Sequence, residues 1–391
     1  MPPEGNQFIA PRNISRRPPL PRFPENLRID ESRLTSLDLF RGIVMFFLIA
    51  EVTGIYELLA RADSAPILKA VAMQFRHHPW HGLRLWDLGQ PFFMFISGTA
   101  MVFSYQKRWK GGESWGGTFR HAARRALVLF SLGWALSRIN PIESGGANEF
   151  LLDILPQLAL AGFLGFLLLR CSALSIAGVA AGIILTTELL YRLWPAPGFD
   201  QLFTPGHNFG SIVDLSLFGR LSEGDWVTFN IVPSTAFVLS GILAGRLIRS
   251  GRAPSRKLWI MAFSGASGIL AGLALDPQTP IIRRICTSSF VILAVGSSLL
   301  AFALAYWIAD VARIRAGSKF FVSVGMNPIF IYVFAFSGGA EWLEKAAAPF
   351  TLGLSKWIGG DKAQILLATV VWGLMWAICR LMYAKKIFIK A

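Results

Sequence analysis

The chain has 391 residues, of which 53% are hydrophobic and only 16% are charged. Soluble globular domains carry about 25% charged residues, so this balance, with a mean hydropathy of +0.50, excludes an ordinary soluble protein and indicates a polytopic membrane protein. The net charge of +15 does not indicate nucleic-acid binding, because the basic residues are spread over many segments instead of forming one stripe.

The N-terminal segment differs in composition from the rest of the chain. Residues 1–33 contain many prolines and arginines and few apolar residues. Because such a segment cannot bury a hydrophobic core, we expect a disordered, basic, Pro-rich cytoplasmic tail. It does not resemble a secretory signal peptide, since the first apolar stretch begins late and is long enough to span a membrane. Residues 34–391 form the predicted transmembrane domain.

Apolar stretches recur along that domain at roughly the 17–25 residues that a helix needs to cross a bilayer. They predict an all-α, polytopic membrane bundle of about ten transmembrane helices near 37–58, 86–106, 124–139, 150–170, 173–194, 229–249, 258–275, 285–309, 320–336 and 363–383. With the N-terminus in the cytoplasm, most Lys and Arg residues fall on the inner side, and the positive-inside rule therefore predicts that both termini are cytoplasmic.

The same topology predicts which connections are extracytoplasmic. They lie near 59–85, 195–228 and 337–362. The second is rich in Gly, Pro and Asp, with a short interfacial helix expected at 211–219. Such loops carry function more often than scaffolds do.

The first predicted helix carries ionisable groups. Asp38 and Arg41 are three residues apart on one helical face, where they can neutralise one another. Glu51 follows about 15 Å further along the helix axis at the standard rise, inside apolar sequence. It either takes part in proton transfer, or is held ionised by a nearby cation, or is a hydrogen-bonded structural residue.

Reactive groups gather in the stretch "RHHPWHGLRLWDLGQPFFMFISG" at 76–98. The stretch contains His77, His78 and His81, and the imidazole group in general titrates near neutral pH, which suits proton transfer between a nucleophile and a leaving group. Asp87 can orient a histidine tautomer or cap the following helix. The alternative is an interfacial aromatic belt with solvated histidines.

A metal site is not expected. His77 and His81 are four residues apart, as helical metal ligands would be, but Pro79 between them disfavours a regular helix. No additional ligand is placed by spacing. The three cysteines fall on different predicted helices and are assigned structural roles: Cys171, Cys286 and Cys379.

The order of three motifs resembles a known family. "SLDLFRG" at 36–42, "HHPWHGLRLWDLGQPFFMFISG" at 77–98 and "ILPQLALAGFLG" at 154–165 resemble the membrane acetyltransferases typified by heparan-α-glucosaminide N-acetyltransferase and their bacterial relatives. Further landmarks follow in the family order: "NFGSIVDLSLFG", "FNIVPSTAFVLSGILAG", "PIIRRICTSSFVILAVG", "VGMNPIFIY" and "KKIFIK". The resemblance covers most of residues 34–390.

The resemblance implies transfer of an acetyl group from cytosolic acetyl-CoA to a sugar amine or hydroxyl on the far side of the membrane. The family pattern His-x-x-Trp-x-Gly-Leu carries the catalytic histidine, which implies His77, followed by Trp80, Gly82 and Leu83. His78 is the second choice. The family commonly has an asparagine late in the preceding helix, where this sequence has Glu51.

The candidate site residues follow from both lines of reasoning. The predicted catalytic residues are His77, Glu51 and Asp87. The predicted substrate-binding residues are Trp80, His78, His81, Gln157, Asn208, Asp214 and Asn327. A CoA donor would bring negative charge to cytoplasmic basic residues, here Arg41, Lys107, Arg108, Arg124 and Arg125, although the positive-inside rule explains these equally well.

We therefore expect an acyltransferase of the bacterial inner membrane whose active site opens to the extracytoplasmic side. Its partners would be membrane lipids and a sugar or glycan acceptor, with acetyl-CoA as donor substrate, no metal and no nucleic acid; a homodimer fits by analogy. One alternative is a transporter or flippase with a proton relay through Glu51 and the histidines, although no clear pair of repeats supports it. Another is a non-catalytic subunit that recruits partners through its tail.

Overall fold

The structure is a computed structural model that describes residues 34–62, 65–139, 149–194, 196–314 and 317–389. These residues form helices and connecting loops with no strand, apart from one isolated β-bridge between His81 and Ile282. The predicted all-α class is confirmed. The predicted tail, residues 1–33, lies outside the described residues.

The N-terminal half of the described chain contains the elements from α1 to α9, including the segment of residues 76–98 that carries the histidines. They are α1 (Thr35–Val52), α2 (Ile55–Arg61), α3 (Pro66–Gln74), the 3-10 turn η1 (Leu85–Leu88), α4 (Gly89–Lys110), α5 (Trp115–Ile139), η2 (Glu149–Leu152), α6 (Ile154–Leu168), α7 (Ala173–Leu193), α8 (Phe209–Phe218), the short turns η3 (Glu223–Asp225) and η4 (Thr228–Asn230), and α9 (Ile231–Arg249).

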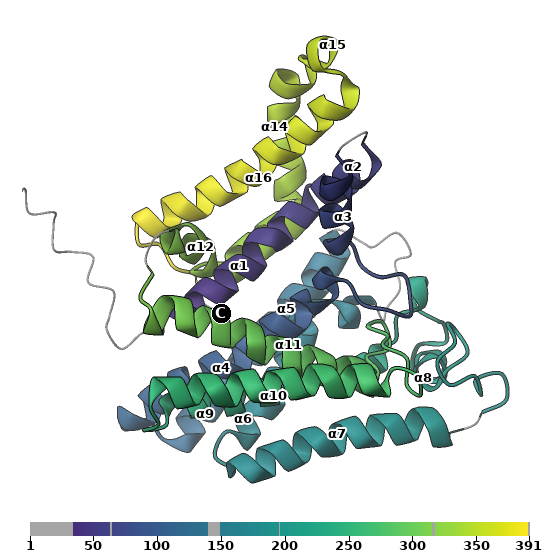
Figure 1. Cartoon of the computed structure of the whole chain (residues 1–391), viewed down its shortest axis with the longest axis vertical. Helices are drawn as coiled ribbons and strands as arrows, with labels where there is room; N and C mark the ends of the chain where they lie inside the picture. The colour runs from purple at the N-terminus through teal and green to yellow at the C-terminus, as the bar shows by residue number, and fades with distance from the viewer. Residues whose placement is uncertain (1–33, 63–64, 140–148, 195, 315–316, 390–391) are drawn as a thin grey trace, which may run out of the picture. The chain divides into compact units, whose positions relative to one another are not determined.

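The C-terminal half contains two irregular helical segments between regular helices. Its elements are α10 (Pro254–Leu275), α11 (Ser288–Tyr306), the π-helical η5 (Trp307–Val311), α12 (Ser318–Gly325), α13 (Pro328–Phe334), the π-helical η6 (Ala335–Gly339), α14 (Ala340–Leu352), α15 (Ser355–Ile358) and α16 (Gly360–Ala384). In Figure 1, α10 runs along α11, and α14 lies beside α16.

Five helices within the described residues are long and apolar enough to cross a membrane: α7, η4–α9, α10, α11–η5 and α16. Two bent pairs raise this number to seven if each is one span, namely α1 with α2, bent by 63°, and α12 with α13–α14, bent by 70°. The chain is an integral membrane protein. Each of the ten predicted spans overlaps a helix, but the number of crossings and the side of the termini stay predictions.

Three segments differ in detail from the sequence expectation. Residues 337–362, expected as a loop, instead form α14 and α15 for most of their length. The basic connection after the second span is also helical, because α4 continues to Lys110 and α5 begins at Trp115. Hydropathy detects neither, since polar and charged residues interrupt the apolar run. A helix, α8, is present where a short helix was expected at 211–219, and its interfacial position stays a prediction.

The helix boundaries near the site follow from local capping. Asp153 begins α6 by accepting a hydrogen bond from Leu155 N at 2.8 Å, and Asn208 begins α8 by accepting one from Ser211 N at 3.1 Å. Pro328 occupies the first turn of α13, where its missing N–H costs nothing. The π-helical segment η6 follows, and such bulges frequently mark functional sites.

The core depends on helices that approach closely at glycines. A Cβ atom on Gly98 of α4 would lie 2.0 Å from Val238 O of α9, and one on Gly241 of α9 would lie 2.0 Å from Phe95 O of α4. Small residues allow membrane helices to pack backbone against backbone. This crossing fixes the beginning of α4, and therefore the loop that carries the histidines, relative to α9.

Candidate active site

The loop of residues 75–84 is anchored by hydrogen bonds to segments distant in the sequence. Trp80 Nε1 donates to Phe203 O at 2.9 Å, and Gly82 N donates to Ile281 O at 2.9 Å. His81 Nε2 lies 2.9 Å from Asp276 Oδ1. These contacts connect the loop to residues 195–228 and to the connection between α10 and α11.

His77 lies between two carboxyl groups that come from different helices. Its Nδ1 lies 3.1 Å from Asp87 Oδ1, and its Nε2 lies 3.4 Å from Glu51 Oε1. The side chains of His77 and Glu51 are about one third exposed, whereas that of Asp87 is buried. The structure therefore brings together the three residues predicted as catalytic.

Asp87 both caps a helical turn and orients the imidazole. Its carboxylate accepts hydrogen bonds from His78 N at 3.3 Å and from Arg84 N at 2.8 Å, besides its contact with His77. Burial would raise the pKa of Asp87, but the His77 and Arg84 hydrogen bonds and the charge of Arg283 lower it below its usual value. An ionised Asp87 can only accept, so Nδ1 of His77 carries the proton and Nε2 of the neutral ring keeps its lone pair.

A cavity of about 550 Å³ opens on His77. Its walls come from α1, η1, the start of α4, the segment before α6, and α13 with η6; lining residues include Leu48, Glu51, Gln90, Phe93, Tyr332 and Phe336. The volume is within the range of small-molecule sites, about 300–1,000 Å³. Apolar walls with a few polar groups are also typical of such sites. We call this space the histidine cavity.

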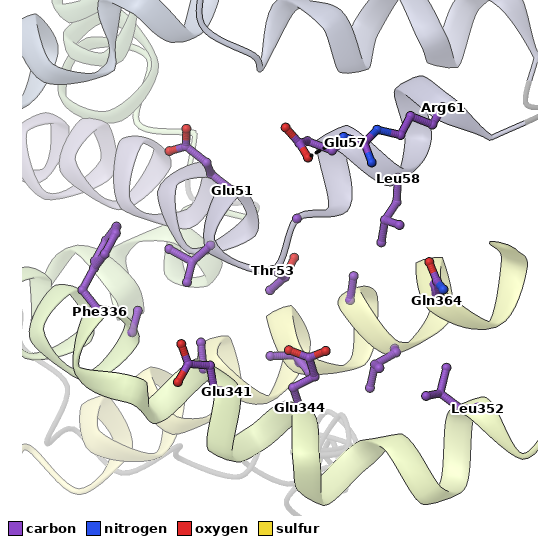
Figure 2. A pocket seen from close by; sticks show the side chains of 17 residues that line it. Glu51, Thr53, Glu57, Leu58, Arg61, Phe336, Glu341, Glu344, Leu352 and Gln364 are labelled. Atoms are coloured by element: carbon purple, nitrogen blue, oxygen red, sulfur yellow. Dashed lines mark hydrogen bonds and ion pairs between the residues drawn. The ribbon is translucent and has the colours of Figure 1, made fainter. Parts of the chain in front are cut away.

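A second cavity of about 710 Å³ shares Glu51 and Phe336 with the first. Figure 2 shows the carboxyl groups of Glu51 and Glu57 on one side of this space and those of Glu341 and Glu344, from α14, on the other. Among the described residues that line it, Arg61 is the single cation, and it pairs with Glu57 at 3.3 Å. We call this space the acidic cavity, because four of its lining residues are glutamates.

The predicted substrate-binding residues divide into two groups. Gln157 is fully buried one contact away from the histidine cavity, since it accepts a hydrogen bond from the lining residue Gln90 and donates to Asn230 Oδ1 at 3.0 Å. Trp80 and His81 instead attach the loop to neighbouring segments, as described above. The imidazole of His78 packs against Gly82, where φ is +136° and a Cβ would lie 2.7 Å from that ring.

The other three predicted substrate-binding residues lie outside both cavities. Asn208 caps α8 and donates to Thr204 O at 2.8 Å. Asp214 accepts hydrogen bonds from Thr228 N and from Ser222 Oγ at 3.1 Å each. Asn327 pairs its amide with the backbone of Ile387 and Ile389 near the C-terminus. The structure does not bring these residues to His77.

The predicted CoA-binding residues do not line the histidine cavity either. Arg41 lies 3.6 Å from Asp38, and Arg108 lies 3.1 Å from Glu113. Lys107 belongs to the last turn of α4. Arg124 and Arg125 belong to α5, and Arg125 lines a small pocket of about 10 Å³ between α4, α5 and α6.

The histidine cavity also has polar and aromatic lining residues that were not predicted as site residues, among them Gln90, Asp153, Trp226, Arg283 and Tyr332. Tyr332 donates to Asp153 Oδ2 at 2.6 Å, and burial raises the pKa of that carboxyl. In the sequence, Asp153 directly precedes one apolar run, and the adjacent Arg283 and Arg284 precede another. These residues are far from the histidines along the chain, so the sequence gave no reason to assign them to the same site.

No group of three or more His, Cys, Asp or Glu side chains among the described residues is arranged to hold a metal ion. Leu48 and Phe93 add apolar surface to the histidine cavity, which His77 and Glu51 also line. The contact of Nδ1 with Asp87 orients the imidazole of His77, and Nε2 is left accessible.

The fold and the site together define an integral membrane protein with a histidine held between carboxylates at a cavity. The sequence family heparan-alpha-glucosaminide N-acetyltransferase, catalytic, matches residues 33–277, more than half of the chain. The chain belongs to this family of membrane acetyltransferases, which confirms the resemblance seen in the motifs. The matched segment contains Glu51, His77 and Asp87. A comparison with curated proteins gives no match.

Proposed function

We propose that the protein transfers an acetyl group from acetyl-CoA to an amine or hydroxyl of a sugar-containing acceptor on the extracytoplasmic side, with His77 as the central catalytic residue. The observation that carries this proposal is the position of His77, with Nδ1 on Asp87 and Nε2 toward Glu51 at a cavity of about 550 Å³. Family membership supports the reaction class.

Two routes are compatible with this geometry. In direct transfer, Nε2 of His77 removes the proton of the acceptor as the acceptor attacks the thioester carbonyl. In the covalent route, Nε2 attacks first and carries the acetyl group before the acceptor displaces it. Asp87 stabilises the positive imidazole in the first route, and Glu51 is placed to receive a proton from Nε2 in the same route.

The acidic cavity supports an acceptor that is a protonated amine when it binds. In the described part of the chain, four glutamates line it against one arginine, so a cation is favoured over an anion there. The cavity adjoins the histidine cavity at Glu51 and Phe336. A bound ammonium group must lose a proton before it attacks, and Glu51 is the lining carboxylate nearest to His77.

The experiment is a transfer assay with purified protein in detergent. Radiolabelled acetyl-CoA is mixed with glucosamine or simple glycans, and label in the sugar and in the protein is followed over time. His77→Ala should abolish transfer, whereas the matched control His207→Ala should not, because His207 lies outside both cavities with Nδ1 3.0 Å from Gly198 O. Equal transfer by the His77→Ala variant would refute the proposal.

Transport is a second candidate, favoured by one observation. Both bent helix pairs, α1–α2 and α12–α14, contribute residues to the acidic cavity, and broken helices commonly form the sites of secondary transporters. In this function Glu51 and His77 would pass protons during solute movement. Solute uptake into proteoliposomes that depends on Glu51 and occurs without acetyl-CoA would favour transport over acyl transfer.

A further inference from the structure

Arg283 is the only cationic side chain among the described residues that line the histidine cavity. It belongs to the connection between α10 and α11, and its side chain is only 15% exposed. The guanidinium carbon lies 4.6 Å from the ring centre of Trp226, which also lines the cavity. A cation above an aromatic face is attracted by the ring without using its N–H donors.

The charge of Arg283 is incompletely paired. Its nearest carboxylate is Asp87, with Nη1 4.0 Å from Oδ1, and the oxygens of Asp87 already accept from His77, His78 and Arg84. The buried Nε has no hydrogen-bond partner in the described part of the chain. A guanidinium group has five donors, and leaving a buried donor unsatisfied costs free energy.

The position of these free donors matters because acyl transfer creates a negative charge. When a nucleophile attacks the thioester, a bond forms to the carbonyl carbon and the π electron pair moves to the carbonyl oxygen. As the intermediate collapses, that pair re-forms the C=O bond and the C–S bond breaks. In direct transfer the thiolate leaves with its electron pair and takes up the proton that His77 removed from the acceptor. In the covalent route the thiolate leaves as the acetyl-histidine forms, and it takes up the proton that the acceptor loses when it displaces the histidine.

We propose that Arg283 binds this carbonyl oxygen and stabilises its negative charge in the transition state. The inference rests on the acyltransferase function proposed above. It holds for both routes, because attack by the acceptor or by His77 places the same charge on the same oxygen. A preorganised donor in a water-poor site acts strongly on such a charge, since no solvent must reorganise.

The geometry also favours this role over simple support of Asp87. A supporting arginine would direct its donors at the carboxylate at hydrogen-bond distance, whereas here the separation is 4.0 Å and Trp226 holds the guanidinium instead. The donors that Asp87 does not use are therefore available to a ligand. Glu51 lies across the same cavity and contributes to the electrostatic environment of Arg283.

The test compares Arg283→Gln with Arg284→Gln in the acetyl-transfer assay. Arg284 is the matched control because it is the neighbouring arginine, donates to Gly224 O and does not line the cavity. We expect Arg283→Gln to lower kcat by about 100-fold, the usual loss for one oxyanion donor. The KM for acetyl-CoA and the midpoint of the pH–rate profile should stay unchanged, and Arg284→Gln should stay within about twofold of wild type.

Two further variants keep the test decisive if Arg283→Gln does not fold, which size-exclusion chromatography and thermal melting in detergent would reveal. Arg283→Lys retains the charge and should lose less activity than a neutral residue. Arg283→Ala should regain kcat when guanidinium ion is added at millimolar concentration, because the ion can occupy the vacated position. Absence of rescue, with the Lys variant as active as wild type, would contradict a role of the guanidinium donors.

The remaining outcomes separate this inference from the proposed function. If Arg283→Gln loses no more activity than Arg284→Gln, Arg283 does not stabilise the oxyanion. A raised KM for acetyl-CoA with retained kcat would assign it to ground-state binding, and a shifted pH midpoint with retained maximal rate would assign it to the support of Asp87. Both overturn the inference while leaving the acyltransferase function intact. Absence of transfer by the wild type overturns both.

Discussion

Nε2 of His77 lies 3.4 Å from Oε1 of Glu51 at the boundary between the histidine cavity and the acidic cavity. Glu51 lines both spaces, so one carboxylate is accessible to the imidazole and to any molecule bound among the glutamates. Of the two described residues that line both cavities, Glu51 and Phe336, only Glu51 can accept or release a proton.

Replacing Glu51 by Gln should lower kcat by about 100-fold or more, because proton transfer by a positioned group contributes roughly 10²–10⁴ to rate. Gln keeps the size of the side chain and removes its basicity. Glu57→Gln is the matched control, since Glu57 lines the same acidic cavity but pairs with Arg61 and Arg76. Initial rates of acetyl transfer at saturating donor would measure the effect. Equal rates for both variants would exclude Glu51 from the relay.

Replacing Asp87 by Asn should lower kcat by about 10²- to 10⁴-fold. An asparagine can donate to Nδ1 of His77, which favours the tautomer with its proton on Nε2 and removes the lone pair that faces Glu51. Asp276→Asn is the control, because Asp276 forms the other Asp–His pair of this region, 2.9 Å from His81. The assay is again acetyl transfer at saturating substrates. A similar loss in both variants would indicate a structural effect on the loop instead.

The lowered pKa of Asp87 also predicts a pH dependence of stability. A carboxyl whose pKa in the folded state is below its usual value of 3.8 stabilises the fold above that value and loses this contribution as pH falls through the folded-state pKa. The melting temperature of wild type should thus exceed that of Asp87→Asn by a constant amount above about pH 5. The difference should shrink below pH 3.8. A difference that grows on acidification would show the opposite sign of shift.

The sequence related the three residues predicted as catalytic to one another better than it related the other residues that line the cavity. His77, Glu51 and Asp87 lie within one stretch of the chain. His77 and Asp87 are close enough in sequence that their spacing and the pairing of an imidazole with a carboxylate predict a contact. The three residues are indeed adjacent in the structure. The choice between capping and orientation for Asp87 could not be made from sequence, because one carboxylate has enough lone pairs for both roles.

Arg283 and Tyr332 could not be assigned to the site in this way. Arg283 lies in the connection between α10 and α11 and Tyr332 lies in α13, both far from His77 along the chain, and tertiary packing alone decides which polar residues of such segments face the cavity. Hydropathy likewise found the apolar spans but not α14, whose Glu341 and Glu344 interrupt its apolar pattern. Asn208 and Asn327 show the converse, since amides suited to a substrate instead satisfy backbone groups.

The crossing of α4 and α9 should tolerate no side chain at its glycines. Gly98→Ala or Gly241→Ala places a Cβ about 2.0 Å from a backbone oxygen of the partner helix, and relieving such overpacking costs about 1–3 kcal/mol. Gly182→Ala on α7 is the control, because nothing lies within 4 Å of its Cβ and Ala favours a helix over Gly by about 1 kcal/mol. Thermal melting in detergent should show a decrease only for the first two. An unchanged melting temperature for both would argue against this close approach.

The acidic cavity should determine the affinity for a cationic acceptor without affecting the chemical step. Glu341 and Glu344 line it from α14, and neither forms an ion pair with a described residue. The double variant Glu341→Gln/Glu344→Gln removes two of its four negative charges and should raise the KM for glucosamine by about tenfold. Its kcat should be retained, because uniform binding energy is lost equally from ground state and transition state.

The control variant is Asp200→Asn, since Asp200 is an exposed loop residue outside both cavities and its replacement tests for a general loss of negative charge. A neutral acceptor should show no change in KM, since its attraction to the glutamates is weak at any ionic strength. A fall in kcat with unchanged KM would instead place these glutamates in the chemical step, and no change in either constant would remove the acidic cavity from the path of the acceptor.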